Sequence, residues 1–314
     1  MRRGGQTVEE AWAPGHIHAM TPLAFALVIA SALLHASWNF LLKRAGGGQV
    51  VVGLSKVAEV LLFAPVFLVG FAATLPPLAT TAWLTGVAAT GVAANYVALG
   101  QAYRHGDLSF VYPISRGAIL VFLPVAGWIA LGERLSGTGG AALACIVTGI
   151  LSLNLRAFSR AALRELTGTL RRRATAWALA AALVAALYTV WDKRAVGTMA
   201  PFAYMYLYTL IVAAGYAAWL LTRHEPRALR SAWRDARGPI VAIGALNTVS
   251  YLLVLAALRT GVTSYVLGLR QLSIAAGVAL GWRYLREPMT PPRAAGVALI
   301  VAGCLLLSLS LQRT

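Results

Sequence analysis

Two arginines lie inside long apolar stretches of the sequence, where a charged side chain is costly. Arg116 and Arg270 are 154 residues apart, and each is followed seventeen residues later by a glutamate, Glu133 or Glu287. A charge at the centre of a membrane helix costs about 2.5–3.5 kcal/mol on insertion scales, so it faces a partner or a water-filled cavity. The guanidinium group is a planar fork of donors that matches carboxylate and phosphonate groups. The pair therefore predicts an anion-binding site, with the alternative that each arginine ties two helices together.

A second polar cluster lies near the end of the first apolar stretch. His35, Asn39 and Lys43 follow one another at intervals of four residues, which places them on one face of a helix. A polar stripe on a membrane helix must face the helix bundle. We therefore expect these three residues to line a substrate-binding cavity, together with Trp38 and with Tyr112 from the stretch that carries the first arginine.

Glu59 is the only acid that we expect deep inside an apolar stretch. Lys56 precedes it by three residues, so the two side chains can meet on one helix face. A buried carboxyl group of this kind can bind and release a coupling proton; the alternative is an internal ion pair that only stabilises the fold. Glu133 and Glu287 stand at the ends of apolar stretches, and we interpret them as structural groups at the membrane interface.

The sequence contains no pattern typical of an enzyme or of a cofactor site. Cys145 and Cys304 lie among small apolar residues without metal-ligand spacing, and we interpret them as small buried side chains. The nucleotide-binding pattern G-x-x-x-x-G-K-[ST] is absent, and no nucleophile–base pair is evident. We therefore expect no cofactor, no metal and no enzymatic activity.

The composition of the chain is that of a membrane protein. Of the 314 residues, 59% are hydrophobic and only 12% are charged, and the mean hydropathy is +0.71, whereas soluble domains carry about 25% charged residues. The apolar residues form blocks of about 20, the length with which a helix crosses a bilayer. The sequence thus predicts an all-α integral membrane protein with ten transmembrane helices, at residues 21–42, 50–70, 82–103, 109–131, 137–155, 175–194, 202–221, 239–258, 263–284 and 293–311.

The charge of the chain is strongly positive, with a net value of +17. Most of the arginines stand between apolar blocks, where they set the topology and contact anionic lipid headgroups. With no soluble domain to carry such a site, we expect no binding of nucleic acid. The loops on the side of the longest basic connector carry 17 lysines and arginines and the opposite side carries seven. Because positive loops stay in the cytoplasm, this count predicts that both termini lie outside.

The second half of the chain repeats the first. Residues 109–153 and 264–307 share one pattern, and Trp38-Asn39 recurs as Trp191-Asp192. Each copy holds an odd number of predicted spans, so the second must enter the membrane from the opposite face. Two inverted-topology five-helix repeats are therefore expected, the arrangement typical of secondary transporters. The predicted organisation is a disordered polar tail at 1–20, a first repeat at 21–155, a basic connector at 156–174 and a second repeat at 175–314.

Several segments resemble a known family. HASWNFLLK (35–43), YRHGDLSFVYPISRG (103–117) and the Gly132-Glu133 pair that ends the fourth span are similar to EamA-type carriers of the drug/metabolite transporter superfamily. The resemblance covers about residues 20–311. It implies a multi-pass plasma-membrane protein that moves small metabolites without ATP, with a central cavity between the repeats and with both termini in the cytoplasm. The second copy departs from the family pattern, because it reads Arg286-Glu287.

Together these observations predict a secondary transporter of small polar metabolites, anionic or zwitterionic because of the two arginines, that works by alternating access at the repeat interface. The alternative is a multidrug exporter of cationic amphiphiles, which would need an uncompensated acid in the cavity. A channel or a membrane enzyme fits the sequence less well. The expected partners are a small-molecule substrate, membrane lipids and a coupling proton, and the protein is expected to act as a monomer or homodimer in the plasma (inner) membrane.

Overall fold

The computed structural model describes residues 21–46, 48–106, 108–155, 157–159 and 173–310. Within them the regular structure is entirely helical. The predicted tail at 1–20 and most of the predicted connector at 156–174 lie outside these residues. The helices are α1 (Pro22–Arg44), α2 (Gln49–Gly70), the short 3-10 helix η2 (Ala72–Thr74), α3 (Leu78–His105), α4 (Leu108–Leu131), α5 (Gly137–Ser152), α7 (Arg173–Thr198), α8 (Pro201–Arg223), α9 (Pro226–Leu258), α10 (Thr263–Arg270), α11 (Leu272–Leu285) and α12 (Pro291–Ser310).

Eight of these helices, α1 to α4, α7 to α9 and α12, are long and apolar enough to cross a membrane. A helix satisfies all its own backbone hydrogen bonds, which the bilayer core cannot do for it. This finding confirms the predicted all-α, multi-pass membrane class. Two predicted spans differ from the expectation: α5 has only 16 residues, and the span expected at 263–284 is divided into α10, of 8 residues, and α11, of 14.

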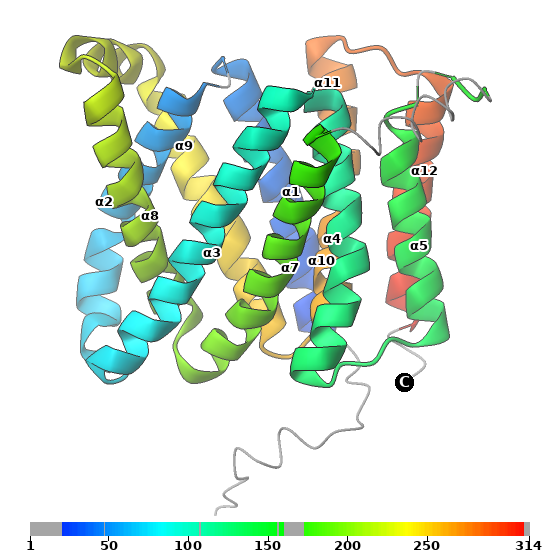
Figure 1. Ribbon diagram of the computed structural model, residues 1–314, viewed down its shortest axis with the longest axis horizontal. Coiled ribbons are helices and arrows are strands. Elements are labelled where there is room, and N and C mark those ends of the chain that lie inside the picture. Colours follow the sequence, from blue (N-terminus) through cyan, green and yellow to red (C-terminus); the bar gives the residue numbers. More distant parts are fainter. Residues whose placement is uncertain (1–20, 47, 107, 156, 160–172, 311–314) are drawn as a thin grey trace, which may run out of the picture.

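The helices stand side by side, and the chain runs up and down the bundle (Figure 1). In that view α1 begins at the lower end, where α12 also ends, whereas α7 begins at the upper end. The two halves of the chain pack into one another: α1 lies against α9 and α11, α3 and α4 lie against α7, and α5 lies against α12. The first and second halves are thus neighbours at most of the helix contacts.

Small residues let these helices approach closely. Gly149 of α5 faces Gly296 of α12, and a Cβ atom on Gly296 would lie 2.7 Å from the carbonyl oxygen of Gly149. Close backbone contact of this kind replaces the hydrophobic effect as the cause of helix association in lipid. In the same pair of helices the thiol of Cys145, half-buried, lies 3.3 Å from the carbonyl oxygen of Leu299, and Cys304 is buried.

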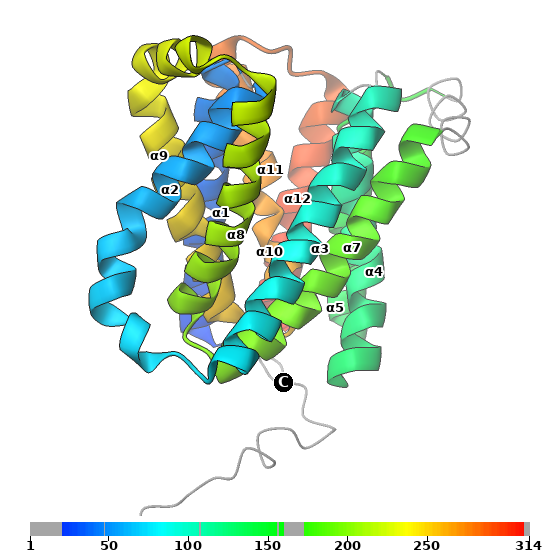
Figure 2. The same ribbon diagram turned by 60° about the vertical axis from the view of Figure 1, so that its left-hand side comes forward.

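Helix α9 begins thirteen residues before the span that the sequence predicts. Its backbone is non-helical at Ala236, and Pro239 follows. Proline removes a backbone donor and bends a helix. The turns before the kink lie across the upper end of the bundle (Figures 1 and 2). This part of α9 carries exposed arginines at intervals of three or four residues: Arg227, Arg230 and Arg234 before the kink and Arg237 directly after it.

Candidate functional site

Arg270 lies at a break in a helix, inside the bundle. It is the last residue of α10, and α11 begins two residues later, after Gln271. Its Nη2 atom lies 3.1 Å from Nδ1 of His35 in α1, and its guanidinium carbon lies 5.2 Å from the centre of the Tyr251 ring in α9. The Nε atom is buried and has no hydrogen-bond partner. A donor without a partner is therefore left at this site.

Arg116 in α4 has the same kind of neighbour. Its guanidinium carbon lies 5.2 Å from the centre of the Tyr112 ring, one turn earlier in the helix. The two arginines are close enough to repel one another, and both act electrostatically on Tyr188 of α7. The structure thus brings together, from distant parts of the sequence, the two arginines and Tyr112 that the sequence singles out.

His35 and Trp38 complete the side of this cluster that α1 provides. His35 is buried, and its Nδ1 atom also faces the indole Nε1 of Trp38 at 3.2 Å. An indole N–H and a guanidinium can only donate, so Nδ1 accepts and the ring proton lies on Nε2. Asn39, half-buried on the same helix, donates from Nδ2 to the carbonyl oxygen of His35 at 2.7 Å. Its amide N–H is therefore used within its own helix.

Lys43 does not belong to this cluster, and the predicted stripe of three cavity-lining residues is wrong at this position. Lys43 is exposed in the last turn of α1 and forms an ion pair with Glu287. A cation in the last turn of a helix is favoured by the helix dipole and, here, by the membrane surface. Helix α1 reaches the surface one turn after Asn39, which is why the third residue of the stripe lies outside the bundle.

Glu59 and Lys56 form the ion pair that their spacing allows. Lys56 Nζ lies 2.8 Å from Oε2 of Glu59, and Asn247 of α9 approaches the same oxygen at 3.3 Å. Glu59 is 4% exposed. The hydrogen bonds and ion pairs of its carboxylate among the described residues do not include Arg116 or Arg270. The pair therefore lies between α2 and α9, beside the arginine cluster rather than within it.

Asp192 is a second buried acid, so the expectation that Glu59 is the only one is wrong. Asp192 is 2% exposed. Its Oδ1 atom accepts a hydrogen bond from the hydroxyl of Tyr204 at 2.6 Å, and its Oδ2 atom accepts one from the hydroxyl of Tyr251 at 2.5 Å. The sequence prediction ends the sixth span at residue 194, which places Asp192 near a membrane surface, but α7 continues to Thr198. The repeat carried a signal, because Asp192 matches Asn39.

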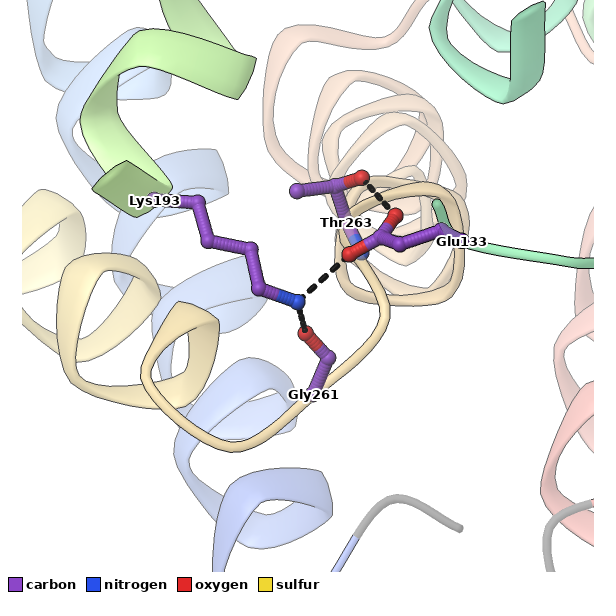
Figure 3. A network of polar contacts seen from close by, with 4 residues as sticks. All are labelled: Glu133, Lys193, Gly261 and Thr263. Carbon is purple, nitrogen blue, oxygen red and sulfur yellow. Dashed lines mark hydrogen bonds and ion pairs between the residues drawn. The ribbon is translucent and has the colours of Figure 1, made fainter. Parts of the chain in front are cut away.

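The two repeated glutamates join opposite halves of the chain. At the lower end Glu133 accepts from Lys193 Nζ at 2.5 Å, and from the backbone N–H and the hydroxyl of Thr263, while Lys193 also donates to the carbonyl oxygen of Gly261 at 2.8 Å (Figure 3). At the upper end Glu287 pairs with Lys43. In both cases a glutamate that follows a span in one half binds a lysine of the first helix in the other half.

A cavity of about 600 Å³ lies between α3 and α7. Its walls are mainly apolar, and Tyr188, which interacts with both arginines, belongs to them. Trp191, which also lines the cavity, donates from Nε1 to the carbonyl oxygen of Leu84 at 3.0 Å and contacts the ring of Trp83 edge to face. Neither arginine is among the residues that line it, and Tyr188 is the residue that this space shares with the polar cluster.

Comparisons with known proteins agree with this architecture. Residues 172–309 match the family model for the EamA-like transporter family. A crystal structure with 15% sequence identity has the same fold, with a TM-score of 0.71 over 92% of this chain and 98% of the other. The chain is also 37% identical over 71 residues to the spermidine export protein MdtI of Cronobacter sakazakii (strain ATCC BAA-894). That match covers 22% of this chain and 65% of the relative, so the chain spans less than two thirds of the relative's length.

The family match falls on the half of the chain that contains Asp192, Tyr251 and Arg270. The resemblance in the first half, at 35–43 and 103–117, falls on the residues that contact or repel Arg270. Both halves therefore contribute to one polar cluster in a bundle of membrane-spanning helices. The second half of the chain, residues 172–309, is thus similar to the EamA-like transporter family, and the chain is a multi-pass membrane protein.

Proposed function

We propose that this protein is a secondary transporter of a small anionic or zwitterionic metabolite that binds between Arg116 and Arg270. One observation carries the proposal: among the described residues, neither of these two interior arginines forms an ion pair with a carboxylate. An uncompensated charge away from water costs several kcal/mol. A bound anion removes that cost, and the unpaired Nε of Arg270 is a donor available to it.

The neighbours of the arginines suit this role. Each guanidinium lies over one tyrosine ring, Tyr112 or Tyr251, an arrangement that stabilises the cation and holds it flat. His35 accepts a hydrogen bond from Arg270, and Trp38 donates one to His35. His35 and Trp38 therefore orient the guanidinium group of Arg270 and do not compete with it for the anion. A carboxylate or phosphonate group is the ligand that such a fork binds with two parallel hydrogen bonds.

The transport mechanism in this proposal is alternating access between two inverted repeats of five spans each. Helix α5 and the α10–α11 pair supply the two crossings beyond the eight long helices. The opposite starting ends of α1 and α7 support the inversion (Figure 1), as do the paired contacts Glu133–Lys193 and Glu287–Lys43. In such a transporter the two repeats exchange conformations, so the site opens first to one side and then to the other.

The remaining parts of the proposal follow from the same architecture. The protein acts as a monomer or homodimer in the plasma (inner) membrane, in contact with lipid, without nucleic acid and without enzymatic activity. An ion gradient or substrate exchange supplies the energy. A coupling proton is part of the proposal, and two buried acids are available to bind it: Glu59, as the sequence predicts, and Asp192.

A ligand screen on the purified protein tests this function. Thermal unfolding is followed in the presence of organic acids, amino acids, phosphonates, spermidine and cationic dyes. An anionic or zwitterionic ligand is expected to raise the unfolding temperature, and Arg116→Gln or Arg270→Gln is expected to weaken its binding by tenfold or more, because a charge-assisted hydrogen bond contributes about 1.5–3 kcal/mol. Arg227→Gln, at an exposed arginine of α9, is the matched control. Normal binding by both interior variants would exclude the site.

Export of a polycation is the second candidate, because the relative MdtI bears the name of a spermidine exporter. A cationic substrate would need Asp192 or Glu59, the two acids inside the bundle, and would be repelled by Arg116 and Arg270. The same screen separates the two candidates. A thermal shift with spermidine that is lost in Asp192→Asn and kept in Arg270→Gln would favour the polycation.

A further inference from the structure

We infer that Asp192 is a proton-binding site whose charge controls the affinity of Arg270 for an anion, so that a proton and the anion bind together. This inference rests on the proposed anion site. It concerns a residue that lies outside the cluster predicted from the sequence, and it follows from three contacts that involve only four side chains.

The first step concerns the hydrogen bonds of Asp192. Both carboxylate oxygens accept from tyrosine hydroxyls, Tyr204 at 2.6 Å and Tyr251 at 2.5 Å. A protonated carboxyl must donate from one oxygen, so proton uptake forces one of the two hydroxyls to become an acceptor or to move away. Tyr204 is fully buried, whereas Tyr251 is half-buried. Tyr251 therefore has more freedom to respond to the proton.

The second step is that Tyr251 also contacts Arg270. Its hydroxyl binds Asp192 while its ring lies 5.2 Å from the guanidinium carbon. A single side chain thus lies between the acid and the arginine. Asp192 and Arg270 also attract one another electrostatically. A proton on Asp192 removes this attraction and frees Tyr251 to move, and both changes favour an anion at Arg270.

The third step is the sum of charges in the cluster. With Asp192 ionised, the charges of Arg116, Arg270 and Asp192 total +1; with Asp192 protonated they total +2. The cluster with the larger positive charge binds an anion more tightly. Linkage makes the effect reciprocal, so the bound anion raises the proton affinity of Asp192 by the same factor.

The other titratable groups nearby do not replace Asp192 in this role. His35 accepts at Nδ1 from a guanidinium and an indole, which holds the ring neutral. Protonation of Glu59 would leave the ammonium group of Lys56, 2.8 Å away, without its counterion. Protonation of Asp192 instead changes hydrogen bonds from neutral hydroxyls and removes a longer-range attraction to Arg270. The remaining ionisable groups that act on Asp192 or on its neighbour Tyr188 are Tyr96 on α3, Arg116 on α4, Tyr208 on α8 and Arg270 on α10.

The experiment compares Asp192→Asn with Glu59→Gln in purified protein. Sulfate is the probe, because its charge stays constant between pH 5.5 and pH 8, and its binding is measured by thermal shift. In the unmodified protein and in Glu59→Gln, sulfate affinity is expected to rise as the pH falls, by a factor within the roughly 5–150-fold range of coupled sites. In Asp192→Asn, sulfate is expected to bind tightly at every pH. Unchanged pH dependence in Asp192→Asn, or its loss in Glu59→Gln alone, would overturn the inference.

A second measurement separates this inference from the proposed anion site. The infrared difference spectrum between high and low pH is expected to show a carboxylic acid band that Asp192→Asn lacks and Tyr251→Phe retains. Tyr251→Phe keeps the acid but removes the bridging hydroxyl, so it is expected to reduce the pH dependence of sulfate binding. If the carboxylic acid band appears but sulfate does not bind, the proposed anion site and its linkage to the proton are both wrong. Sulfate binding that needs both arginines, without the band, would overturn only the role of Asp192.

Discussion

Lys193 in α7 and Glu133 after α4 form an ion pair of 2.5 Å that joins the second half of the chain to the first. The glutamate side chain is 9% exposed and the lysine side chain 20% exposed. The corresponding pair at the other end, Lys43 and Glu287, is much more open to solvent, with exposures of 62% and 31%. A lysine–glutamate ion pair thus joins the two halves of the chain at each end of the bundle, and the Lys193–Glu133 pair is much less exposed than the Lys43–Glu287 pair.

The first prediction follows from this difference. Lys193→Met leaves a nearly buried carboxylate without its cation, and breaking a buried pair costs about 3–5 kcal/mol. Lys43→Met breaks an exposed pair, which contributes about 0–1 kcal/mol. We expect a clear drop in the unfolding temperature of the purified protein for Lys193→Met and little change for Lys43→Met. Equal drops in unfolding temperature would show that the difference in burial does not make the two ion pairs differ in their contribution to stability.

The second prediction concerns the contact between α5 and α12. In Gly296→Ala the new methyl group would lie 2.7 Å from the backbone oxygen of Gly149, and a backbone atom cannot easily move aside. We expect a loss of about 1–3 kcal/mol of stability, typical of overpacking. Gly140→Ala in α5 is the control, since nothing lies within 4 Å of its added atom. The measurement is thermal unfolding, and an equally stable Gly296→Ala would contradict the close packing.

The third prediction tests the acceptor beside Arg270. In His35→Leu both Arg270 and Trp38 lose the atom to which they donate, and a buried unsatisfied donor costs about 1–3 kcal/mol. His35→Asn keeps a side-chain acceptor near that position. We expect ligand affinity and stability to fall in the leucine variant and to be largely retained in the asparagine variant. Equal losses of ligand affinity in both would mean that the imidazole has another role, such as contact with the ligand.

The fourth prediction is the orientation in the membrane. Among the described residues, twelve lysines and arginines lie at the upper end of the bundle and four at the lower end. Positive residues stay in the cytoplasm, so this distribution places the upper end inside, whereas the family resemblance implies the reverse. In a background without Cys145 and Cys304, Ser231→Cys at the upper end should resist an impermeant maleimide in intact cells, and Thr260→Cys at the lower end should react. The opposite pattern would show that the family orientation holds.

The arginine cluster could be predicted from the sequence because two arginines in apolar stretches have few acceptable surroundings. Their cost in hydrocarbon forces them into the interior, and the repeat indicated that they would meet. Their partners were harder to predict. Tyr251 contacts Arg270 from another helix, and nothing in the local spacing of a tyrosine shows which helix will pack beside it.

The errors have physical causes as well. The repeat pairs Asp192 with Asn39, but the sequence does not indicate that Asp192 is a buried acid, because the apolar stretch in α7 ends before the helix does. The last turns of α7 stay inside the bundle, where tyrosine hydroxyls satisfy the acid. Lys43 fits a helical stripe with His35 and Asn39 by its spacing, yet spacing does not show where a helix reaches the membrane surface. The sequence gives no sign of the break between α10 and α11, because Arg270 and Gln271 are ordinary helix formers.

That break has a mechanical consequence. Every residue of α10 from Thr263 to Leu269 is buried, whereas most of α11 lies nearer the outside. The span therefore consists of a buried part, α10, and a more exposed part, α11, and Arg270 is the last residue of the buried part. We expect an anion bound at Arg270, as proposed, to act at this break, so that a change in the angle between α10 and α11 displaces the end of α11, where Glu287 pairs with Lys43 of α1.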